Sequence, residues 1–547
     1  MPDASTSTAP ATRNAPGAPP TLLDVLVVGA GFSGMYLITR LRALGLSFRV
    51  VEAGTDVGGT WYWNRYPGAR VDVHSVTYSY SWDRELEQEW QWRERFAPQP
   101  ELLEYIGHVA DRHELRREIS FETRVTSAHW DESAERWQIA TDRGESYSAR
   151  YCIMAVGCLS VPNMPDFKGL DSFPGDWYHT GLWPHEGVDF TGKRVAVIGT
   201  GSTSIQATPQ IVKQAEHVTL FQRTPNYSIP AWNRPQDRAE EDAAKADSAA
   251  RRHKARYSFT GDVFDFCEKP ISETPLEEVH AELERRWQNG GFEFLGSYMD
   301  ILMDAKSNEI VAEFVRDKIR AIVRDPATAE LLCPRNYFGT KRLCVDTGYF
   351  EIFNRDNITL YDARTNPIVE ITPQGVKTTK DEIEVDAIVF AIGFDAITGP
   401  LFSIDIRGVG GEALKEKWAD GPRTYLGLGS HGFPNMFMIT GPQSPSVLSN
   451  MMVSIEQHVD WVSDLIGYLE ERGLHTIEPE LDAEDAWVDH CRELGDATLH
   501  PHDDTWYMGA NIPGKPRVFM PYIGGVDTYR RQCEEIAAAG YPGYALK

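Results

Sequence analysis

Two short apolar runs that each end in a glycine-rich turn constrain the fold of this chain most strongly. The first run, DVLVVGAGFSG, spans residues 24–34 and continues into helically spaced apolar residues from Met35 onward. The second, RVAVIGTGSTS, spans residues 194–204 and continues into Ile205. Each has the strand, tight turn and helix of a dinucleotide-binding unit. We therefore expect an α/β protein with two Rossmann-like dinucleotide-binding domains.

The first turn has the full glycine pattern. Gly29 allows the tight turn, Gly31 lets the backbone approach a pyrophosphate, and Gly34 lets the helix pack on the strand. The next apolar run ends at Glu52, 18 residues after the last glycine (52 − 34). A carboxylate there can accept hydrogen bonds from both hydroxyls of an unphosphorylated ribose. The first unit is thus predicted to bind an adenine dinucleotide with a free ribose diol.

The second turn departs from this pattern at its last position. Ser204 stands where the third glycine is expected, so the contact between helix and strand should be looser or shifted. The next apolar run leads to Arg223, 19 residues further on (223 − 204), where the first unit has its acid. A guanidinium there can bind a 2′-phosphate through two hydrogen bonds. NADP(H) is favoured over NAD(H), although a surface arginine at a strand end is also common.

The 547 residues are enough for two to four domains. Residues 231–333 change to charge-rich helical sequence, and strand-like sequence returns near residues 358 and 387. We expect a disordered tail over 1–20, the first dinucleotide-binding domain in two pieces over 21–158 and 387–547, the second over 159–230 and 334–386, and a helical insertion over 231–333.

The charge balance argues against two classes of partner. Lys and Arg number 54 against 80 Asp and Glu, a formal net charge of −26, which disfavours binding to nucleic acid or to an anionic membrane. Residues Thr424–Ile455 carry no Lys, Arg, Asp or Glu, but Gly, Pro and Ser interrupt them throughout. We expect this stretch to lie buried beside an apolar surface and not to span a membrane.

Cysteine usage bounds the redox chemistry and the compartment. The seven cysteines include no Cys-x-x-Cys pair, so neither a zinc or other metal site nor a disulfide reductase is expected. The first twenty residues lack the apolar run of a signal peptide. Both observations favour a reducing, cytoplasmic location.

The segment FPGDWYHTGLWP, residues 173–184, lies between the two units. Its residues alone suggest a linker that can move, with Phe173 and Trp183 as anchors and Gly175 as a hinge, and a histidine such as His179 is more often structural than catalytic. The spacing F-x-G-x-x-x-H-x-x-x-W-P, however, resembles the fingerprint of type I Baeyer–Villiger monooxygenases. The Trp-Pro ending points away from the related flavin-dependent N- and S-oxygenases.

This resemblance extends from about residue 21 to the C-terminus and implies a reaction. The family uses FAD and NADPH to insert one oxygen atom of O₂ beside the carbonyl of a small-molecule ketone, through a deprotonated C4a-peroxyflavin, and forms an ester or lactone. No obligate protein partner is implied. A peroxyanion needs a permanent cation beside it, which a guanidinium supplies. The resemblance assigns this role to Arg342 and the orienting carboxylate to Asp72.

Other segments resemble the cofactor sites of the family. Residues 58–72 resemble a flavin-covering segment, 339–342 the segment with the catalytic arginine, and 509–517 a mobile loop over nicotinamide and substrate. The resemblance implies FAD contacts from Gly29, Gly31, Ser33, Gly34, Glu52, Thr60, Trp61, Tyr62, Trp63, Asp72, Tyr78, Val125 and Met451. It implies NADP contacts from Arg70, Gly199, Thr200, Gly201, Ser202, Thr203, Ser204, Gln206, Arg223, Thr224, Lys341 and Trp506.

Departures from the family pattern leave substrate preference and flavin tuning open. His74 stands where a carboxylate is common, Cys158 replaces a glutamine, and Ile392 replaces a threonine. The apolar stretch 424–455 and the small Cys158 lead us to expect apolar aryl and cyclic ketones first and steroid ketones second. Two alternatives remain, a flavin-dependent N- or S-oxygenase, which does not need Arg342, and an NADP-sensing binding protein without a reactive flavin.

Overall fold

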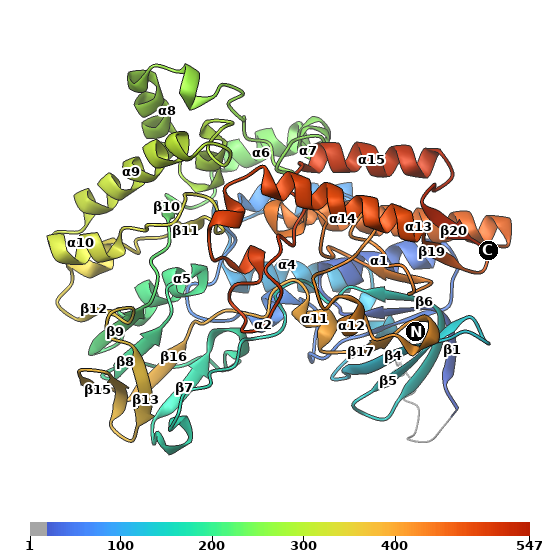
Figure 1. The fold of residues 1–547 in the computed structure, drawn as a ribbon, viewed down its shortest axis with the longest axis horizontal. Coiled ribbons are helices and arrows are strands. Elements are labelled where there is room, and N and C mark those ends of the chain that lie inside the picture. The colour runs from blue at the N-terminus through green and yellow to red at the C-terminus, as the bar shows by residue number, and fades with distance from the viewer. Residues whose placement is uncertain (1–18) are drawn as a thin grey trace, which may run out of the picture.

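A computed structural model of the protein describes residues 19–547 (Figure 1). The predicted tail over residues 1–20 lies outside the described residues except for its last two. Two sheets stand side by side, the one with β1 at the lower right of Figure 1 and the one with β8 at the lower left. Within residues 19–547, no helix is long and apolar enough to cross a membrane.

The first sheet contains eight strands in the order β17-β4-β5-β6-β1-β2-β3, with β18 also paired to β6. Strand β1 runs parallel to both β2 and β6, whereas β5 is antiparallel to β4 and β6. The inner half of β1, residues 25–28, is buried because helices and loops cover both faces of the sheet. The strands are β1 (Thr21–Val28), β2 (Phe48–Val51), β3 (Ile119–Ser120), β4 (Val125–Asp131), β5 (Arg136–Thr141), β6 (Ser146–Met154), β17 (Asp405–Arg407) and β18 (Met436–Met438).

Helices α1 (Phe32–Ala43) and α13 (Met451–Arg472) pack against each other and share one apolar core with β1. The charge-free stretch 424–455 passes through this part of the molecule and is almost entirely buried, as the sequence predicts. The remaining elements around this sheet are α2 (Thr60–Trp63), α3 (Arg84–Glu89), α4 (Gln99–Arg112), α11 (Gly399–Phe402), α12 (Leu414–Lys417), α14 (Leu481–Asp496), α15 (Val526–Ala538), and the antiparallel pair of β19 (Ile477–Pro479) and β20 (Tyr544–Leu546).

The second sheet has five parallel strands in the order β12-β9-β8-β16-β7. They are β12 (Ile358–Asp362), β9 (His217–Gln222), β8 (Arg194–Ile198), β16 (Ala387–Phe390) and β7 (Asp176–His179). Helix α5 (Ser202–Ile211) follows β8. Smaller sheets are formed by β13 (Ile368–Thr372), β14 (Gly375–Thr378) and β15 (Glu382–Glu384), and by β10 (Ser228–Pro230) with β11 (Cys344–Asp346).

Two predictions about chain organisation were wrong. Strand β16 starts at residue 387 and lies between β8 and β7, so this strand belongs to the second sheet and not to the first domain. Its apolar sequence predicts a strand, but it cannot tell which of two parallel sheets the strand joins. Residues 176–179 form β7 and are no free linker, because pairing with β16 satisfies their backbone hydrogen bonds. The rest of the predicted division into domains stays a proposal.

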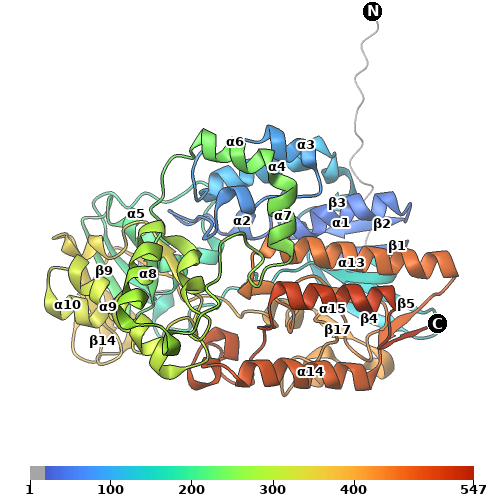
Figure 2. The ribbon, with the colours of Figure 1, turned by 90° about the horizontal axis from the view of Figure 1, so that it is seen from above.

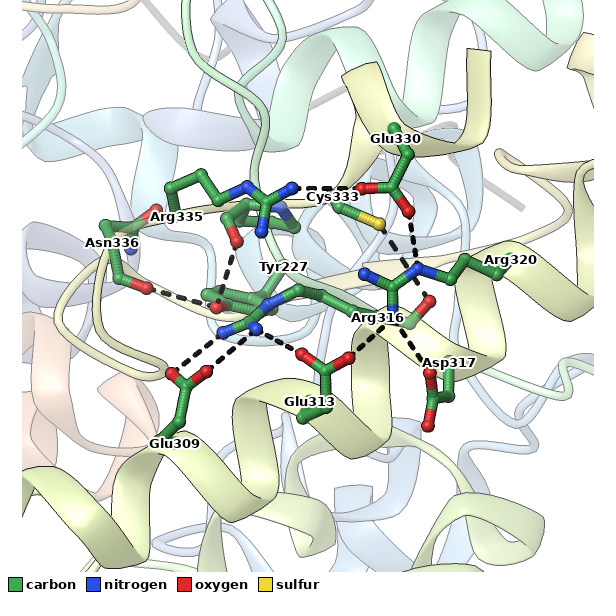
Figure 3. A network of polar contacts seen from close by, with 11 residues as sticks. Tyr227, Glu309, Glu313, Arg316, Asp317, Arg320, Glu330, Cys333, Arg335 and Asn336 are labelled. Atoms are coloured by element: carbon green, nitrogen blue, oxygen red, sulfur yellow. Dashed lines mark hydrogen bonds and ion pairs between the residues drawn. The ribbon is translucent and has the colours of Figure 1, made fainter. Parts of the chain in front are cut away.

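The segment between β10 and β11 is helical. Its helices α8 to α10 lie at the left of Figure 2. It contains α6 (Arg238–Ala246), α7 (Ser248–Arg256), α8 (Leu276–Asn289), α9 (Ala305–Ile322) and α10 (Pro326–Leu332). Apolar residues of α8 and α9 share a core with β8 and β9. Figure 3 shows a network of ion pairs on this segment, in which Arg316 joins Glu309 and Glu313 while Arg320 joins Glu313 and Glu330. These contacts fix α9 relative to α10.

Candidate active site

The first glycine turn is closely packed by the protein backbone. Gly29 has φ +104°, and a Cβ there would lie 2.5 Å from the carbonyl oxygen of Ala155. A Cβ on Gly34 would lie 1.9 Å from the Gly29 carbonyl oxygen, and one on Gly31 would lie 3.4 Å from the Cα of Gly59. Gly31 precedes α1 without a side-chain cap, so the first N–H groups of the helix can receive a phosphate. The turn fits a dinucleotide pyrophosphate.

Glu52 reaches this turn from the end of β2, as predicted. Its Oε2 accepts a hydrogen bond from Ala30 N at 2.8 Å, and its Oε1 accepts one from Gly54 N at 2.7 Å. Burial raises the pKa of this carboxyl group, and the two backbone N–H groups oppose that rise. A carboxylate oxygen accepts more than one hydrogen bond, so Glu52 can also receive a ribose hydroxyl.

The segment after Glu52 covers the turn. Residues 60–63 form α2, which starts next to the Gly59 that faces Gly31. Trp61 Nε1 donates to Tyr78 Oη at 3.2 Å, which joins two of the residues assigned to FAD by resemblance. Ser33 is buried at the start of α1. Val125 begins β4 as a core residue of the first sheet.

The second glycine turn repeats the first and stays more open. Gly199 has φ +110°, and a Cβ there would lie 2.3 Å from the Ala391 carbonyl oxygen. Within residues 19–547, no heavy atom beyond Gly201 and its two chain neighbours lies within 4 Å of a Cβ built on Gly201, which precedes α5 without a side-chain cap. Thr200 Oγ1 donates to the Thr224 carbonyl oxygen at 2.7 Å. Helix α5 begins with Ser202 and Thr203 at this turn, so it too presents free N–H groups to a phosphate.

Two cations flank the second turn. Arg223 is exposed at the end of β9, and Lys341 is half-buried. Burial lowers the pKa of Lys341, and the positive charge of Arg223 contributes to the same direction. The two charges therefore lie within electrostatic range of each other, an arrangement that a phosphate dianion would stabilise.

Gln206 links α5 to the first part of the chain. Tyr66 Oη donates to Gln206 Oε1 at 2.8 Å, and Gln206 Nε2 donates to the Arg70 carbonyl oxygen at 3.2 Å. Gly68 approaches so closely that a Cβ there would lie 2.4 Å from the Gln206 carbonyl oxygen. Arg70 pairs with Glu94 at 3.1 Å. The structure thus joins two residues assigned to NADP, Arg70 and Gln206, at the contact between the two glycine units.

Asp72 and Arg342, 270 residues apart, form a two-point ion pair. Arg342 Nε donates to Asp72 Oδ2 at 2.8 Å and Nη2 donates to Oδ1 at 3.0 Å. Arg342 Nη1 donates to the Val447 carbonyl oxygen at 2.6 Å, and the guanidinium lies 4.8 Å from the ring centroid of Phe292. Burial alone would lower the pKa of Arg342, but the Asp72 carboxylate raises it above its ordinary value. The guanidinium is held charged and in one orientation.

An apolar cluster, called here the arginine-side cluster, lies next to this ion pair. Its members are apolar side chains from the segment after β6, from the charge-free stretch and from the C-terminal part. They are Cys158, Leu159, Val447, Leu448, Met451, Trp506, Tyr507, Met508, Phe519 and Ile523. Burial raises the pKa of the Tyr507 hydroxyl, and the Arg342 charge opposes that rise. Trp506 packs on Tyr507 with ring centroids 4.1 Å apart. The cluster can exclude water from the space beside the guanidinium.

The loop 509–517 is fastened to the segment that follows β16. Asn511 Nδ2 donates to the Phe394 carbonyl oxygen at 2.7 Å. Lys515 Nζ donates to Asp395 Oδ1 at 2.7 Å and to the Ala396 carbonyl oxygen at 2.6 Å. In this structure the loop therefore bridges the C-terminal part of the chain and the second sheet, and its predicted mobility stays a prediction.

The fingerprint residues lie in and around β7 of the second sheet. His179 is buried at the end of β7, and its Nδ1 accepts from Gly181 N at 3.0 Å. Phe173 and Trp183 are buried in two cores, and a Cβ on Gly175 would lie 2.4 Å from the Asp386 carbonyl oxygen. These contacts favour a structural role for the motif.

Sequence reasoning missed three groups that hold the site together. Phe292 comes from the helical insertion, Val447 accepts a hydrogen bond from Arg342 through its carbonyl oxygen, and Tyr66 bridges to α5. The sequence could have indicated Tyr66 as a site residue, because it lies in the aromatic, glycine-rich segment 58–72. Nothing in the sequence singles out Phe292 or the backbone of Val447, since both contacts depend on tertiary packing.

Comparison with known proteins adds independent observations. Residues 26–245 match the family model of the pyridine nucleotide-disulphide oxidoreductases. A Baeyer–Villiger monooxygenase of Pseudooceanicola batsensis is 42% identical over 522 residues, 95% of either chain, and phenazine N-monooxygenase of Lysobacter antibioticus is 40% identical over 531 residues, 96% of this chain and 97% of its own.

Solved structures agree with these relatives. Oxidized steroid monooxygenase bound to NADP superimposes with a TM-score of 0.93 at 52% identity, over 96% of this chain and 99% of that one. A structure of OTEMO with FAD and NADP superimposes with a TM-score of 0.93 at 38% identity, over 96% and 99%. Together with the two glycine turns, these comparisons show that the chain is an NADPH-dependent flavoprotein monooxygenase that binds FAD, and that it belongs to the type I Baeyer–Villiger monooxygenase family.

Proposed function

We propose that this enzyme inserts one oxygen atom of O₂ next to the carbonyl of an apolar ketone and so produces an ester or lactone. The observation that carries the proposal is the two-point Asp72–Arg342 ion pair at 2.8 and 3.0 Å beside an apolar cluster. FAD, when bound and reduced by NADPH, would supply the electrons that activate O₂. The side chains of this protein would hold the cofactors and the ketone, stabilise negative charge on oxygen and exclude water.

Arg342 is the group that would stabilise negative charge on oxygen. A guanidinium stays protonated at any working pH, so it provides a permanent charge where a lysine or histidine could lose its proton. Asp72 fixes the plane of the guanidinium through two hydrogen bonds, and the Val447 carbonyl oxygen fixes a third nitrogen. The cation is thus oriented before a substrate arrives, which removes a reorganisation cost.

The cofactor residues listed from the resemblance are part of this proposal. The first turn with Glu52 would hold FAD, because its carboxylate suits an unphosphorylated ribose. The second turn with Arg223 and Lys341 would hold NADPH, because two cations suit a 2′-phosphate. This assignment is supported by the open second turn and by the exposure of Arg223.

The substrate class follows from the arginine-side cluster. Its members carry no formal charge, so an anionic ketone would find no partner there other than Arg342. Burying an unpaired carboxylate costs several kcal/mol, whereas each buried CH₂ contributes about 0.8 kcal/mol. We expect aryl and cyclic ketones to be preferred, followed by steroid ketones, and the steroid monooxygenase at 52% identity supports including the latter.

Oxygenation of nitrogen or sulfur is the second candidate. It is favoured by one relative, phenazine N-monooxygenase, at 40% identity. Attack by a soft nucleophile needs no charged oxygen and therefore no Arg342. Turnover of ketones, amines and thioethers by one preparation would separate the candidates, and exclusive oxidation of amines would overturn the ketone proposal.

Replacement of Arg342 tests the proposed role directly. Arg342→Ala should abolish ester formation while FAD stays bound, because the cation is lost and the FAD turn is untouched. Product analysis after NADPH oxidation with a ketone panel measures this, and Arg342→Lys tests whether a single-point cation suffices. Arg335→Ala, which removes an exposed arginine paired with Glu330 a few residues earlier, is the matched control. Normal ester formation by Arg342→Ala would refute the mechanism.

A further inference from the structure

The segment that carries Lys341 and Arg342 has no regular secondary structure of its own. It runs from the end of α10 at Leu332 to the start of β11 at Cys344. Residues 334–343 lie outside any helix or strand, so side chains from elsewhere help to hold them. Two of these contacts act on residues 337–340, directly before Lys341, and they come from different parts of the chain.

The first hold comes from the helical insertion. Asn308 on α9 is buried, and its Nδ2 donates to the Phe338 carbonyl oxygen at 2.9 Å. Its Oδ1 accepts from Phe338 N at 2.8 Å. The amide thus pairs with the backbone of one residue as a neighbouring strand would.

The second hold comes from the C-terminal part of the chain. Asp503 Oδ2 accepts from Tyr337 N at 2.9 Å and from Thr340 Oγ1 at 2.6 Å. The ring of Tyr337 also lies against His502, with centroids 6.3 Å apart. Asp503 therefore binds the segment at Tyr337 and at Thr340, the residue directly before Lys341.

Asp503 also lies near the arginine-side cluster in the sequence. Trp506 and Tyr507 follow it by three and four residues and belong to that cluster. The negative charge of Asp503 opposes the lowering of the Lys341 pKa by burial, so this carboxylate favours the charged form of Lys341. Asp503 thus holds the backbone before Arg342 and is joined to the aromatic pair by a short stretch of its own chain.

We propose that Asp503 is a positioning residue that couples the aromatic segment 506–508 to the Lys341–Arg342 segment. When NADP binding restricts the motion of one of these two segments, the contacts of Asp503 also restrict the motion of the other. The part of this inference that concerns NADP rests on the proposed role of Lys341. The part that concerns coupling rests on the contacts of Asp503 with Tyr337 and Thr340 and on the short stretch of chain between Asp503 and Trp506.

Hydrogen–deuterium exchange on the full-length, FAD-loaded protein tests the coupling without any ketone. Asp503→Ala should speed exchange roughly tenfold in peptides that cover both 336–342 and 505–510, because a backbone hydrogen bond and its anchor are lost. Asp504→Asn is the control for exchange, since Asp504 is exposed and pairs with Arg517, whereas the hydrogen bonds to Tyr337 and Thr340 come from Asp503. Faster exchange in 336–342 alone, with 505–510 unchanged, would overturn the coupling.

Asp503→Asn tests whether the hydrogen bond to the backbone is what holds the segment. The amide oxygen can still accept from Tyr337 N, so exchange in both peptides should stay near wild type. Exchange as fast as in Asp503→Ala would overturn this role of the hydrogen bond. Thr340→Val removes one of the two donors to Asp503 and should give a smaller acceleration in both peptides, so the coupling stays testable where Asp503→Ala does not fold.

The exchange experiment on Asp503 and the test of the proposed function on Arg342 can fail independently of each other. If Arg342→Ala keeps ketone oxygenation, the proposed mechanism fails, but the exchange result for Asp503→Ala is unaffected. If both peptides keep wild-type exchange in Asp503→Ala, the coupling fails, although ketone oxygenation can be normal.

Discussion

The two glycine turns begin alike and differ in what surrounds them. Gly29 and Gly199 both have positive φ and both approach a carbonyl oxygen so closely that a side chain would clash. Beyond this point the first turn is closed by its own chain, since Gly31 faces Gly59, whereas a Cβ built on Gly201 would meet no atom of a non-adjacent described residue within 4 Å. The difference suits a cofactor that stays bound in the first turn and one that enters and leaves the second.

The third position of each turn shows the same contrast. Gly34 leaves no room for any side chain, because its helix lies directly on the Gly29 carbonyl oxygen. Ser204 is fully buried at the equivalent place, where its Oγ lies 3.2 Å from Thr208 Oγ1. The second unit therefore tolerates a side chain that the first cannot, and substitutions at both turns test how far this difference reaches.

Gly34→Ala should have the largest effect. The new methyl group would lie 1.9 Å from the Gly29 carbonyl oxygen, so the turn must open. We expect loss of bound FAD and a loss of about 3 kcal/mol or more of unfolding free energy. The absorbance of the purified protein and its thermal unfolding measure both effects. A variant that retains FAD and wild-type stability would remove the contrast with Ser204.

Arg223→Ala should reduce the preference for NADPH over NADH by about ten- to a hundredfold, which corresponds to a charge-assisted phosphate contact of roughly 1.5–3 kcal/mol. The ratio of kcat/KM for the two nicotinamides measures it, and FAD content should not change. Lys213→Ala, an exposed cation just after the far end of α5, serves as the control. An unchanged ratio would show that Arg223 does not read the phosphate.

Both halves of the molecule bury a histidine that accepts a backbone hydrogen bond at Nδ1. His458 accepts from Thr440 N at 2.9 Å, and His179 accepts from Gly181 N. Burial lowers the pKa of both, to about 3 for His458. The unfolded chain binds a proton near pH 6.5 while the native imidazole stays neutral, so the free energy of unfolding falls as the pH falls below that value.

The expected slope is about 1.4 kcal/mol per pH unit for His458 between pH 6 and 4. Urea unfolding at several pH values should show a shallower slope for His458→Gln than for the wild type. Equal slopes would mean that His458 is protonated in the native state. The same comparison with His179→Gln shows whether His179 makes its own contribution to the pH dependence of the free energy of unfolding.

Ser204→Ala should have the smallest effect. It removes one hydroxyl and its contact with Thr208, which costs about 1 kcal/mol, and leaves the turn unchanged. Thermal unfolding and the Kd for NADP⁺ measure it. A loss as large as that of Gly34→Ala would show that the second turn is as tightly packed as the first.

The parts predicted from sequence are those in which short-range pattern decides the geometry. Spacing alone places Glu52 at the first turn, and the glycines need their special backbone conformations whatever surrounds them. The sheet to which β16 belongs was predicted wrongly, because an apolar strand fits either parallel sheet. The Phe292 contact with Arg342 was not predicted, since it depends on how the helical insertion docks.

The pairing of β18 with β6 has a consequence for biosynthesis. Cys152 and Met154 in β6 lie opposite Met436 and Met438, so this edge of the first sheet is completed 284 residues (436 − 152) after its partner has been made. At roughly 5–20 residues per second, a ribosome needs on the order of 15–60 s to reach that point. During this interval the nascent first sheet exposes an unpaired strand edge of the kind that chaperones bind and that aggregation exploits.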